Sequence, residues 1–307
     1  MIIRVLGSAA GGGVPQWNCN GRNSILARGA LSEVVPRSQS SLAVSADGKT
    51  WVLLNASPDL RQQIAETPAL HPNAAGPLRN SPIAAVVLTN ADIDHIAGLL
   101  TLREGHAFVV YGSERVQSTL AANSVFNVLA PDLVKRVALI LDHPTVISSP
   151  QGKIGLDVRA FAVPGKVALF LESGSQADFG TADGDTIGLE VRAGDRSFIY
   201  LPACARVDAS LAKRLRGAEL VFFDGTLFTD DEMISQGLSQ KTGKRMGHIS
   251  MSGPEGSMAA LADLDIKRKV YIHINNSNPV LREGSPERAQ VEAAGWDVAY
   301  DGMEIRL

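Results

Sequence analysis

A continuous apolar run covers residues 83–88, between Pro82 and the polar pair Thr89-Asn90. Such a run predicts a buried strand with both faces covered. Apolar side chains then return at helical spacing, at Ile96, Leu99, Leu100 and Leu102. The polar residues between the predicted strand and helix therefore fall at the carboxyl edge of a sheet, where α/β folds commonly build their sites.

The rest of the chain alternates short apolar segments with polar turns. Asp47-Gly48 is a strong turn signal and predicts a hairpin between strands over 41–45 and 51–55. Ser57 and Pro58 are typical of the cap and first residue of a helix. Further strands are predicted over 1–6, 107–111, 154–163, 167–171, 186–192, 197–201, 219–223, 269–274, 298–299 and 304–307. Further helices are predicted over 96–103 and 113–122, and near 211–215, 255–264 and 286–294.

Hairpins mixed with strand–helix units predict an α/β (α+β) fold, in which sheets are covered by helices, and not a doubly wound parallel sheet. We find no internal repeat, low-complexity tract or linker, so a single domain over residues 1–307 is expected. The Gly-rich segment 7–13 lacks both the G-x-G-x-x-G pattern and the lysine of a P-loop. It predicts a loop whose backbone passes close to another group.

Composition narrows the function classes. Lys plus Arg is 29 and Asp plus Glu is 32, so the formal net charge is 29 − 32 = −3. No basic run is present, which argues against nucleic-acid binding. No apolar run approaches the roughly 20 residues that span a bilayer. The only cysteines are Cys19 and Cys204, so we expect no disulfide framework. We expect a cytoplasmic location.

Groups that can bind a metal or move a proton follow several predicted strands, and His248 lies in a Gly-containing loop. Taken singly, each has an ordinary structural interpretation, as a core histidine or as a cap of a turn or helix. Two carboxylates and a histidine within four positions nevertheless indicate a cation nearby. The residues at strand ends are Asn90, Asp92, Asp94, His95, Lys166, Asp224 and His273.

The segment Asn90-Ala91-Asp92-Ile93-Asp94-His95, followed by Gly98, resembles the H-x-H-x-D-H…G motif of the metallo-β-lactamase superfamily. Asn90 and Asp92 stand in place of its first two histidines. Pro164-Gly165-Lys166 is similar to the later P-G-H, with Lys166 replacing histidine. His273 falls where the last metal histidine is expected, and Ala203 or Cys204 where a bridging aspartate usually lies. The resemblance implies an αβ/βα sandwich of two mixed sheets flanked by helices.

Further segments resemble one branch of that superfamily, a family of pyrroloquinoline quinone (PQQ) biosynthesis proteins, over essentially the whole length. They are 7–20, 37–41, 55–59, 163–166, 223–226, 246–248 and 273–276. Members of that family often read W-N-C-N-C-x-x-C, a cysteine cluster associated with structural zinc. This chain keeps Cys19 but has Gly21 and Ser24 at the other two positions. A lone thiolate cannot hold tetrahedral zinc, so none is predicted there.

The resemblance implies one divalent metal, held by two histidines and one or two carboxylates: Asp92, Asp94, His95 and His273. That ligand set favours Fe(II) over zinc, with zinc as the alternative in isolated protein. The implied activity is iron- and O2-dependent hydroxylation of the tyrosine ring of a cross-linked Glu–Tyr precursor of PQQ. His248 is the candidate for proton transfer, Lys166 for binding substrate carboxylates, and Asp224 is a third catalytic candidate. Ordinary structural roles remain equally open for Lys166 and His248.

Two other functions remain open. A PQQ carrier would help to transport or release PQQ or its precursor without catalysis, by binding alone. A zinc hydrolase on the same fold is disfavoured by Asn90 and Lys166. The resemblance implies a small-molecule or modified-peptide PQQ precursor as a partner. It leaves open binding to other PQQ biosynthesis proteins and to a second copy of the chain.

Overall fold

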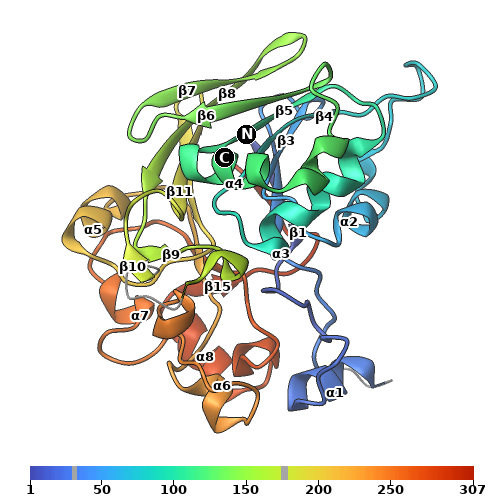
Figure 1. Ribbon diagram of the computed structural model, residues 1–307. Helices are drawn as coiled ribbons and strands as arrows, with labels where there is room; N and C mark the ends of the chain where they lie inside the picture. Colours follow the sequence, from blue (N-terminus) through green and yellow to red (C-terminus); the bar gives the residue numbers. More distant parts are fainter. Residues whose placement is uncertain (30–32, 174–178) are drawn as a thin grey trace.

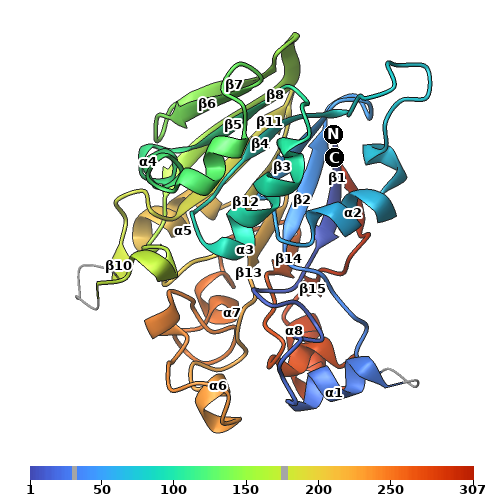
Figure 2. The same cartoon turned by 45° about the vertical axis from the view of Figure 1, so that its right-hand side comes forward.

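The computed structural model describes residues 1–29, 33–173 and 179–307. Within these residues, two mixed seven-stranded sheets pack face to face (Figures 1 and 2). In spatial order, the first sheet contains β16 (Glu304–Arg306), β1 (Ile2–Gly7), β2 (Ser41–Ser45), β3 (Trp51–Leu54), β4 (Ile83–Val87), β5 (Phe108–Ser113) and β6 (Val134–Leu139). The second contains β15 (Trp296–Val298), β14 (Lys269–Ile272), β13 (Val221–Asp224), β12 (Arg196–Leu201), β11 (Ile187–Ala193), β8 (Gly152–Ala162) and β7 (Pro144–Ser149).

Each sheet has an antiparallel and a parallel half. In the first, β16, β1, β2 and β3 pair antiparallel, and β3, β4, β5 and β6 pair parallel. In the second, β12 to β15 are parallel, while β7, β8, β11 and β12 pair antiparallel. A separate small ribbon is formed by β9 (Gly165–Lys166) and β10 (Phe179–Thr181). The parallel halves bring several strand ends to the same edge of the sandwich, where the candidate site lies.

Helices cover the outer faces of both sheets. Helices α2 (Leu60–Glu66), α3 (Ile93–Ile96) and α4 (Glu114–Ala122) pack on the first sheet, and α5 (Ala209–Leu215), α7 (Ser257–Ala260) and α8 (Pro286–Ala293) on the second. Helices α1 (Arg22–Arg28) and α6 (Glu232–Ser235) lie at the end of the molecule beyond the sheets (Figure 2). No described helix is long and apolar enough to cross a membrane.

Burial follows this layering. Alternate residues of β1 and β2, such as Val5 and Val44, face alternate residues of β12 and β13, such as Tyr200 and Phe222, in one core between the sheets. The other sides of the strands form two further cores with the helices. The shared core supports the proposal that residues 1–307 form a single domain. The predicted αβ/βα sandwich is confirmed by this arrangement.

Most predicted elements are present, but three predictions need correction. Residues 167–171 are not a strand: Leu169–Leu171 form a 3₁₀ turn with exposed side chains. The helix expected to begin at Pro58, with Ser57 as its cap, begins at Leu60, and the Ser57 hydroxyl donates to Gln63 Oε1 instead of capping. Helix α7 covers only 257–260 of the expected 255–264.

Candidate metal centre

Adjacent strands of the first sheet fix the turn that carries the metal motif. Asn55, just after β3, adopts a left-handed backbone conformation with φ of 64°. Its Oδ1 accepts the backbone N–H of Thr89 at 2.8 Å, and its Nδ2 donates to Thr89 Oγ1 at 2.9 Å. The end of β4 is therefore tied to the end of β3. The chain then enters α3 with Asp92 at its N-cap and with Asp94 and His95 inside the helix.

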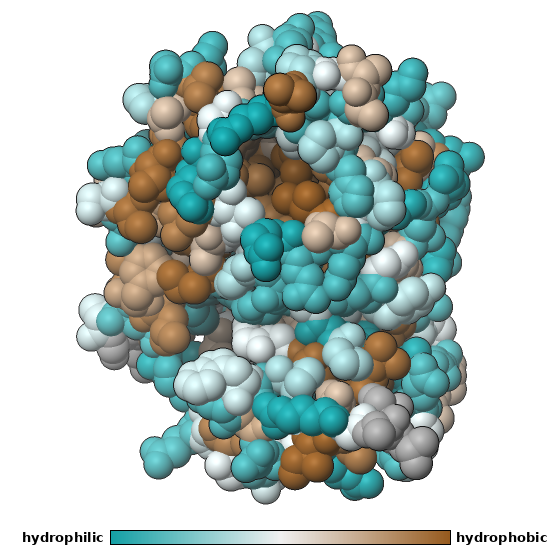
Figure 3. All heavy atoms as spheres, turned by 90° about the vertical axis from the view of Figure 1, so that its right-hand side faces the viewer, coloured by the Kyte–Doolittle hydropathy of each residue, from teal (hydrophilic) through white to brown (hydrophobic). Residues whose placement is uncertain are grey.

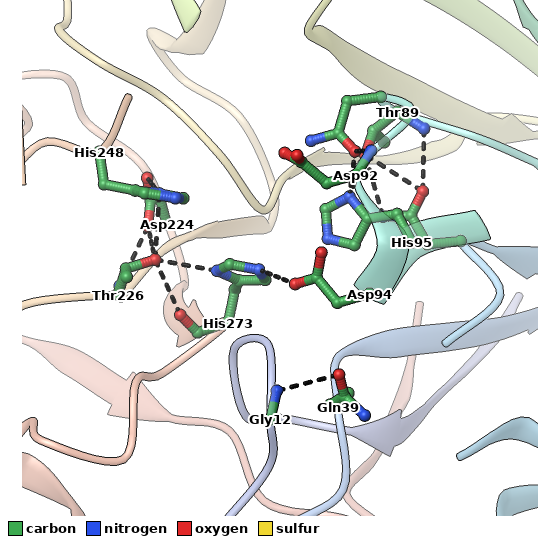
Figure 4. Close-up of polar contacts among 12 residues, drawn as sticks. Gly12, Gln39, Thr89, Asp92, Asp94, His95, Asp224, Thr226, His248 and His273 are labelled. Carbon is green, nitrogen blue, oxygen red and sulfur yellow. Dashed lines mark hydrogen bonds and ion pairs between the residues drawn. The ribbon is translucent and has the colours of Figure 1, made fainter. Parts of the chain in front are cut away.

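Asp94, His95 and His273 form a group whose ligand atoms lie within 4.8 Å of one another (Figure 4). His273 Nε2 is 3.0 Å from Asp94 Oδ2. The His95 and His273 rings meet edge to face, with centroids 5.2 Å apart. His95 Nε2 is buried and has no hydrogen-bond partner among the described residues. A buried nitrogen without a partner, beside a carboxylate and a second imidazole, suits a cation bound between them.

Both histidines are held by the nitrogen that faces away from this group. His95 Nδ1 donates to Asn90 Oδ1 at 2.7 Å. His273 Nδ1 donates to Thr226 Oγ1 at 2.9 Å, and that hydroxyl donates to Asp224 Oδ1 at 2.7 Å. Such partners fix the tautomer and ring orientation of metal-binding histidines. The two Nε2 atoms are therefore the ones left to bind a metal.

The protonation of the group also fits a cation. Burial lowers the pKa of His95 to about 4, so this imidazole is neutral near pH 7. Burial alone would lower the pKa of His273, but the hydrogen bond and charge of Asp94 raise it overall. Burial opposes ionisation of Asp94, yet the neighbouring histidines hold its pKa below the usual range. Asp94 and His273 thus share a proton whose place a metal cation would take.

His273 itself is in a conformation that non-glycine residues rarely adopt, with φ of 59°. It follows β14, and the next residue donates its backbone N–H to Ser8 O at 2.9 Å. Backbone strain of this kind, of order 1–3 kcal/mol, persists where the surrounding structure enforces it and is common at functional sites. Here it turns the imidazole from the strand end toward Asp94.

Asp224, His248 and His273 form a second group of possible ligand atoms. The fully buried Asp224 accepts hydrogen bonds from Cys204 N at 2.9 Å and from Thr226 N at 3.0 Å, besides the Thr226 hydroxyl. Its Oδ2 also lies 2.7 Å from His248 Nδ1. Because these contacts occupy both carboxylate oxygens, Asp224 orients its neighbours, and His248 keeps Nε2 for the cavity that it lines.

Asp92 and Lys166 lie beside the metal group and not within it. Asp92 Oδ1 accepts from Lys166 Nζ at 3.2 Å and from Leu169 N at 3.1 Å. Neither group of ligand atoms in the described residues includes Asp92, which sequence reasoning counted among the ligands. Its carboxylate instead ties the motif turn to β9 and the 3₁₀ turn.

These residues surround a cavity of about 220 Å³. Its lining residues are Ala10, Gly11, Asn90, Asp92, Asp94, Lys166, Leu169, Glu172, Ala203, Thr226, Lys241, Met246, His248 and His273. The surface has other hollows, and one with hydrophobic side chains at its bottom is visible in Figure 3. A larger cavity of about 410 Å³ lies at the opposite, amino ends of β4 and β5, but neither group of ligand atoms contributes to it.

Sequence reasoning missed several residues that build the site. Asn55 and Thr226 were part of segments that carried the family resemblance, but nothing in the sequence showed which strand ends they would join. Gly11 belongs to the loop that was predicted to pass close to another group, and this is confirmed. A Cβ atom at Gly11 would lie 3.3 Å from Asp94 Oδ2.

Cys19 is buried and takes part in hydrogen bonds. Its Sγ donates to Asn276 Oδ1 at 3.4 Å and accepts the Gly21 N–H at 3.2 Å. In the described part of the chain, no group of metal-ligand atoms includes Cys19. The absence of a structural zinc at this position remains a prediction.

Comparisons with known proteins agree with this geometry. The Beta-lactamase superfamily domain matches residues 50–274. Coenzyme PQQ synthesis protein B of Xanthomonas euvesicatoria is 52% identical over 307 residues, covering 100% of both chains. The protein of the same name from Rhizobium meliloti is 54% identical over 305 residues, covering 99% of this chain and 97% of the relative.

Solved structures extend the comparison. Zn²⁺-bound PqqB from Methylobacterium extorquens superposes with a TM-score of 0.95 at 51% identity, covering 100% of both chains. A diphosphatase of the PhnP family superposes with a TM-score of 0.68 at 20% identity, covering 99% of this chain and 96% of that one. At that level of identity the second likeness concerns the fold alone.

Proposed function

The chain belongs to the coenzyme PQQ synthesis protein B family within the β-lactamase superfamily, and from this premise we propose that it is an oxygenase. Its substrate is a Glu–Tyr-derived precursor of PQQ, and its reaction is Fe(II)- and O2-dependent hydroxylation of the tyrosine ring. Such a role makes the PQQ precursor its small-molecule partner.

One observation carries this proposal: Asp94 Oδ2 and the Nε2 atoms of His95 and His273 converge, and His95 Nε2 is buried without a partner. Two histidines and one carboxylate with open positions are the ligand set of non-haem Fe(II) oxygenases. The same three residues would also hold Zn²⁺, the ion named for the relative from Methylobacterium extorquens. A bound Fe(II) ion would supply the activation of O2.

Asn90 and Lys166 argue against a hydrolase with two metals. They stand where the superfamily motif has histidines, and here they make other contacts. Asn90 Oδ1 accepts from His95, and Lys166 Nζ pairs with Asp92 at 3.2 Å. An ammonium group beside the cavity repels a second divalent cation. We therefore propose one metal per chain.

The surrounding side chains position the substrate and its protons. His248 Nδ1 donates to Asp224, so Nε2 is free to take a proton from the tyrosine hydroxyl or ring and to return it to solvent. Asp224 holds that tautomer and supports His273 through Thr226. Lys166 offers its ammonium group to a substrate carboxylate. Leu169 contributes an apolar side chain to the cavity beside the substrate ring.

The decisive experiment is anaerobic reconstitution with Fe(II), followed by addition of O2, a Glu–Tyr substrate and ascorbate. One oxygen atom enters the ring as hydroxyl and the other leaves as water, so ascorbate supplies two electrons and solvent supplies two protons. We expect stoichiometric O2 consumption and a hydroxylated ring detected by mass spectrometry. His273→Ala should abolish both, whereas His143→Ala, at an exposed histidine, should preserve both.

If the protein is instead a carrier of PQQ, the opposite results are expected for oxygen consumption and ring hydroxylation. A carrier would bind PQQ tightly while consuming no oxygen and leaving the tyrosine ring unmodified. That combination of results would show the hydroxylase proposal to be wrong. Full retention of iron by His273→Ala would refute the ligand set.

A further inference from the structure

Three cations converge on one carboxylate at the cavity. Glu172 Oε1 lies 3.8 Å from Lys166 Nζ, and Glu172 Oε2 lies 3.7 Å from Lys241 Nζ and 3.5 Å from Arg245 Nη1. We refer to Lys166, Lys241 and Arg245 as the cation cluster. They come from β9, from the segment after α6, and from the 3₁₀ turn Lys244–Met246. Two chain regions far apart in sequence, one with Lys166 and one with Lys241 and Arg245, thus place positive charge around Glu172.

The cation cluster has more donors than its carboxylate partners can use. Each lysine has three N–H donors and the arginine five. The distances to Glu172 exceed the roughly 2.7–2.9 Å of strong charge-assisted hydrogen bonds. Among the described residues, Glu172 is the one carboxylate within 4.0 Å of Lys241 or Arg245. As far as the described residues go, donors on both side chains therefore remain available for another anion.

The cation cluster borders the candidate metal centre: Arg245 does not line the cavity, but it immediately precedes Met246, which does. Lys166, Lys241 and Glu172 line the same cavity as Asp94 and His273. The Glu172 and Lys166 side chains are only 11% and 12% exposed, whereas the Lys241 and Arg245 side chains are each 40% exposed. Burial strengthens the electrostatic contact between Lys166 and Glu172, while solvent screens those of Lys241 and Arg245 more strongly and leaves both cations accessible to a ligand.

Packing contacts fix the directions of two of the cations. The guanidinium of Arg245 lies over the Phe179 ring, 3.7 Å from its centroid. Gly247 has φ of 84° and leaves room for the lysine stem, because a Cβ atom there would lie 3.0 Å from Lys166 Cγ. Counting only residues that the structure describes, three cations face the two carboxylates Glu172 and Asp92, so positive charge exceeds negative charge at this side of the cavity.

We propose that the cation cluster is a carboxylate-binding subsite and that Lys241 and Arg245 select substrates that carry a carboxylate remote from the reacting ring. The substrate class is a compact aromatic di-acid, since a cavity of about 220 Å³ is small for a ligand site. Glu172 occupies the anion position when substrate is absent and limits non-specific anion binding. This inference deepens the proposed function and rests on it.

The test is calorimetric titration of the Fe(II)-loaded protein without O2, so that substrate binds and does not react. The probes are N-acetyl-Glu–Tyr, a di-acid, and N-acetyl-Gln–Tyr amide, which lacks both carboxylates and carries no charge. Wild-type protein should bind the di-acid more tightly. Lys241→Gln and Arg245→Gln should each weaken di-acid binding by about tenfold and leave binding of the neutral probe unchanged.

Two further variants separate charge effects from damage to the fold. Lys244→Gln removes the same charge from the residue next to Arg245, but Lys244 pairs with the exposed Glu255 at 2.6 Å. It should bind both probes like wild type. Glu172→Gln removes the competing anion and should strengthen di-acid binding, which a merely damaged site would not do.

Equal binding of both probes by wild type, or unchanged di-acid binding by Lys241→Gln and Arg245→Gln, would overturn this proposal. Weaker di-acid binding by Glu172→Gln would also contradict it. Inorganic pyrophosphate binding more tightly than the di-acid would assign the cluster to phosphate instead. These readouts are independent of oxygen consumption, so hydroxylation without carboxylate selection, or the reverse, identifies which proposal has failed.

Discussion

The Oδ1 atom of Asn90 lies 2.7 Å from the Nδ1 atom of His95, at the position where the superfamily motif has a histidine. The same oxygen accepts the backbone N–H of Asp92 at 3.0 Å. A residue that would bind a metal in the motif has thus become one that orients a ligand and closes the turn. The replacement of the motif's first histidine by Asn90 therefore removes one possible ligand and at the same time orients another, His95.

Asn90→Ala should therefore weaken metal binding although Asn90 is not a ligand. Loss of such an orienting partner typically costs about 10–100-fold in metal affinity. Competition between the protein and a chromophoric chelator for Fe(II) would measure the change under anaerobic conditions. Asn127→Ala, at an exposed asparagine, is the matched control. Unchanged affinity in Asn90→Ala would show that Asn90 does not position His95.

Metal content gives a second prediction, namely one metal ion per chain after saturation and removal of excess. The Lys166 ammonium group has no lone pair for a metal, and the Asn90 carbonyl oxygen is neutral and already accepts from His95 Nδ1 and Asp92 N. Elemental analysis of protein loaded with Fe(II), and separately with Zn²⁺, would measure the ratio. Two tightly held ions per chain would contradict the single-metal proposal.

The fold was largely predictable because the central strands that lead to the candidate site are buried on both faces. The burial of β2, β3 and β4 is complete, and their apolar runs predicted them closely. Of the four described strands that were missed, β9 and β10 form the small separate ribbon, and β6 and β7 lie at the edges of their sheets and have mixed burial. Edge strands carry a weaker hydrophobic pattern because one side faces solvent.

Solvent exposure also explains why the strand predicted over 167–171 is absent. The apolar residues of this segment predict burial, but the side chains of Leu169, Phe170 and Leu171 are 61%, 44% and 47% exposed. Apolar side chains left exposed beside a cavity usually have a binding role. A pattern that counts apolar residues cannot distinguish a buried strand from an apolar rim.

The candidate site was predictable as a set of residues but not as a geometry. The motif and strand ends named Asp94, His95 and His273, which the structure brings together. They also named Asp92, which pairs with Lys166 instead. Direction of a side chain depends on its backbone, and the φ of 59° at His273 is imposed by contacts that no local sequence pattern encodes.

His248→Gln should separate proton transfer from metal binding. We expect the variant to retain Fe(II), because His248 Nδ1 is engaged with Asp224 and the three proposed ligands, Asp94, His95 and His273, are intact. The kcat of hydroxylation should fall by about 10²-fold, the usual effect of losing a general base. Iron titration and stopped-flow oxygen consumption provide the two measurements. Loss of iron along with activity would make His248 a ligand.

A zinc measurement tests the prediction at Cys19. Its Sγ is engaged with Asn276 and the Gly21 N–H, and Gly21 and Ser24 supply no thiolate. Protein purified from zinc-supplemented medium should therefore have the same zinc content in wild type and Cys19→Ser. A lower zinc content in Cys19→Ser would establish a structural zinc that involves this thiolate.

Glu232, at the start of α6, should make stability depend on pH. Burial raises its pKa to about 7, although Ser277 Oγ and Phe228 N donate hydrogen bonds to its carboxyl. Its ordinary pKa is 4.5, so the folded protein holds this proton more tightly than the unfolded chain. The stabilisation is full below pH 4.5 and is lost as the pH rises through 7.

The free energy of unfolding should accordingly fall between pH 5 and pH 8 by up to about 3 kcal/mol through this group. Glu232→Gln mimics the protonated carboxyl and should flatten that part of the pH profile. Urea unfolding at half-unit pH intervals would measure both profiles, with Glu255→Gln, at an exposed carboxylate, as the control. If Glu232→Gln keeps the wild-type slope, Glu232 is ionised in the folded protein at neutral pH and its burial is compensated by the two hydrogen bonds that it accepts.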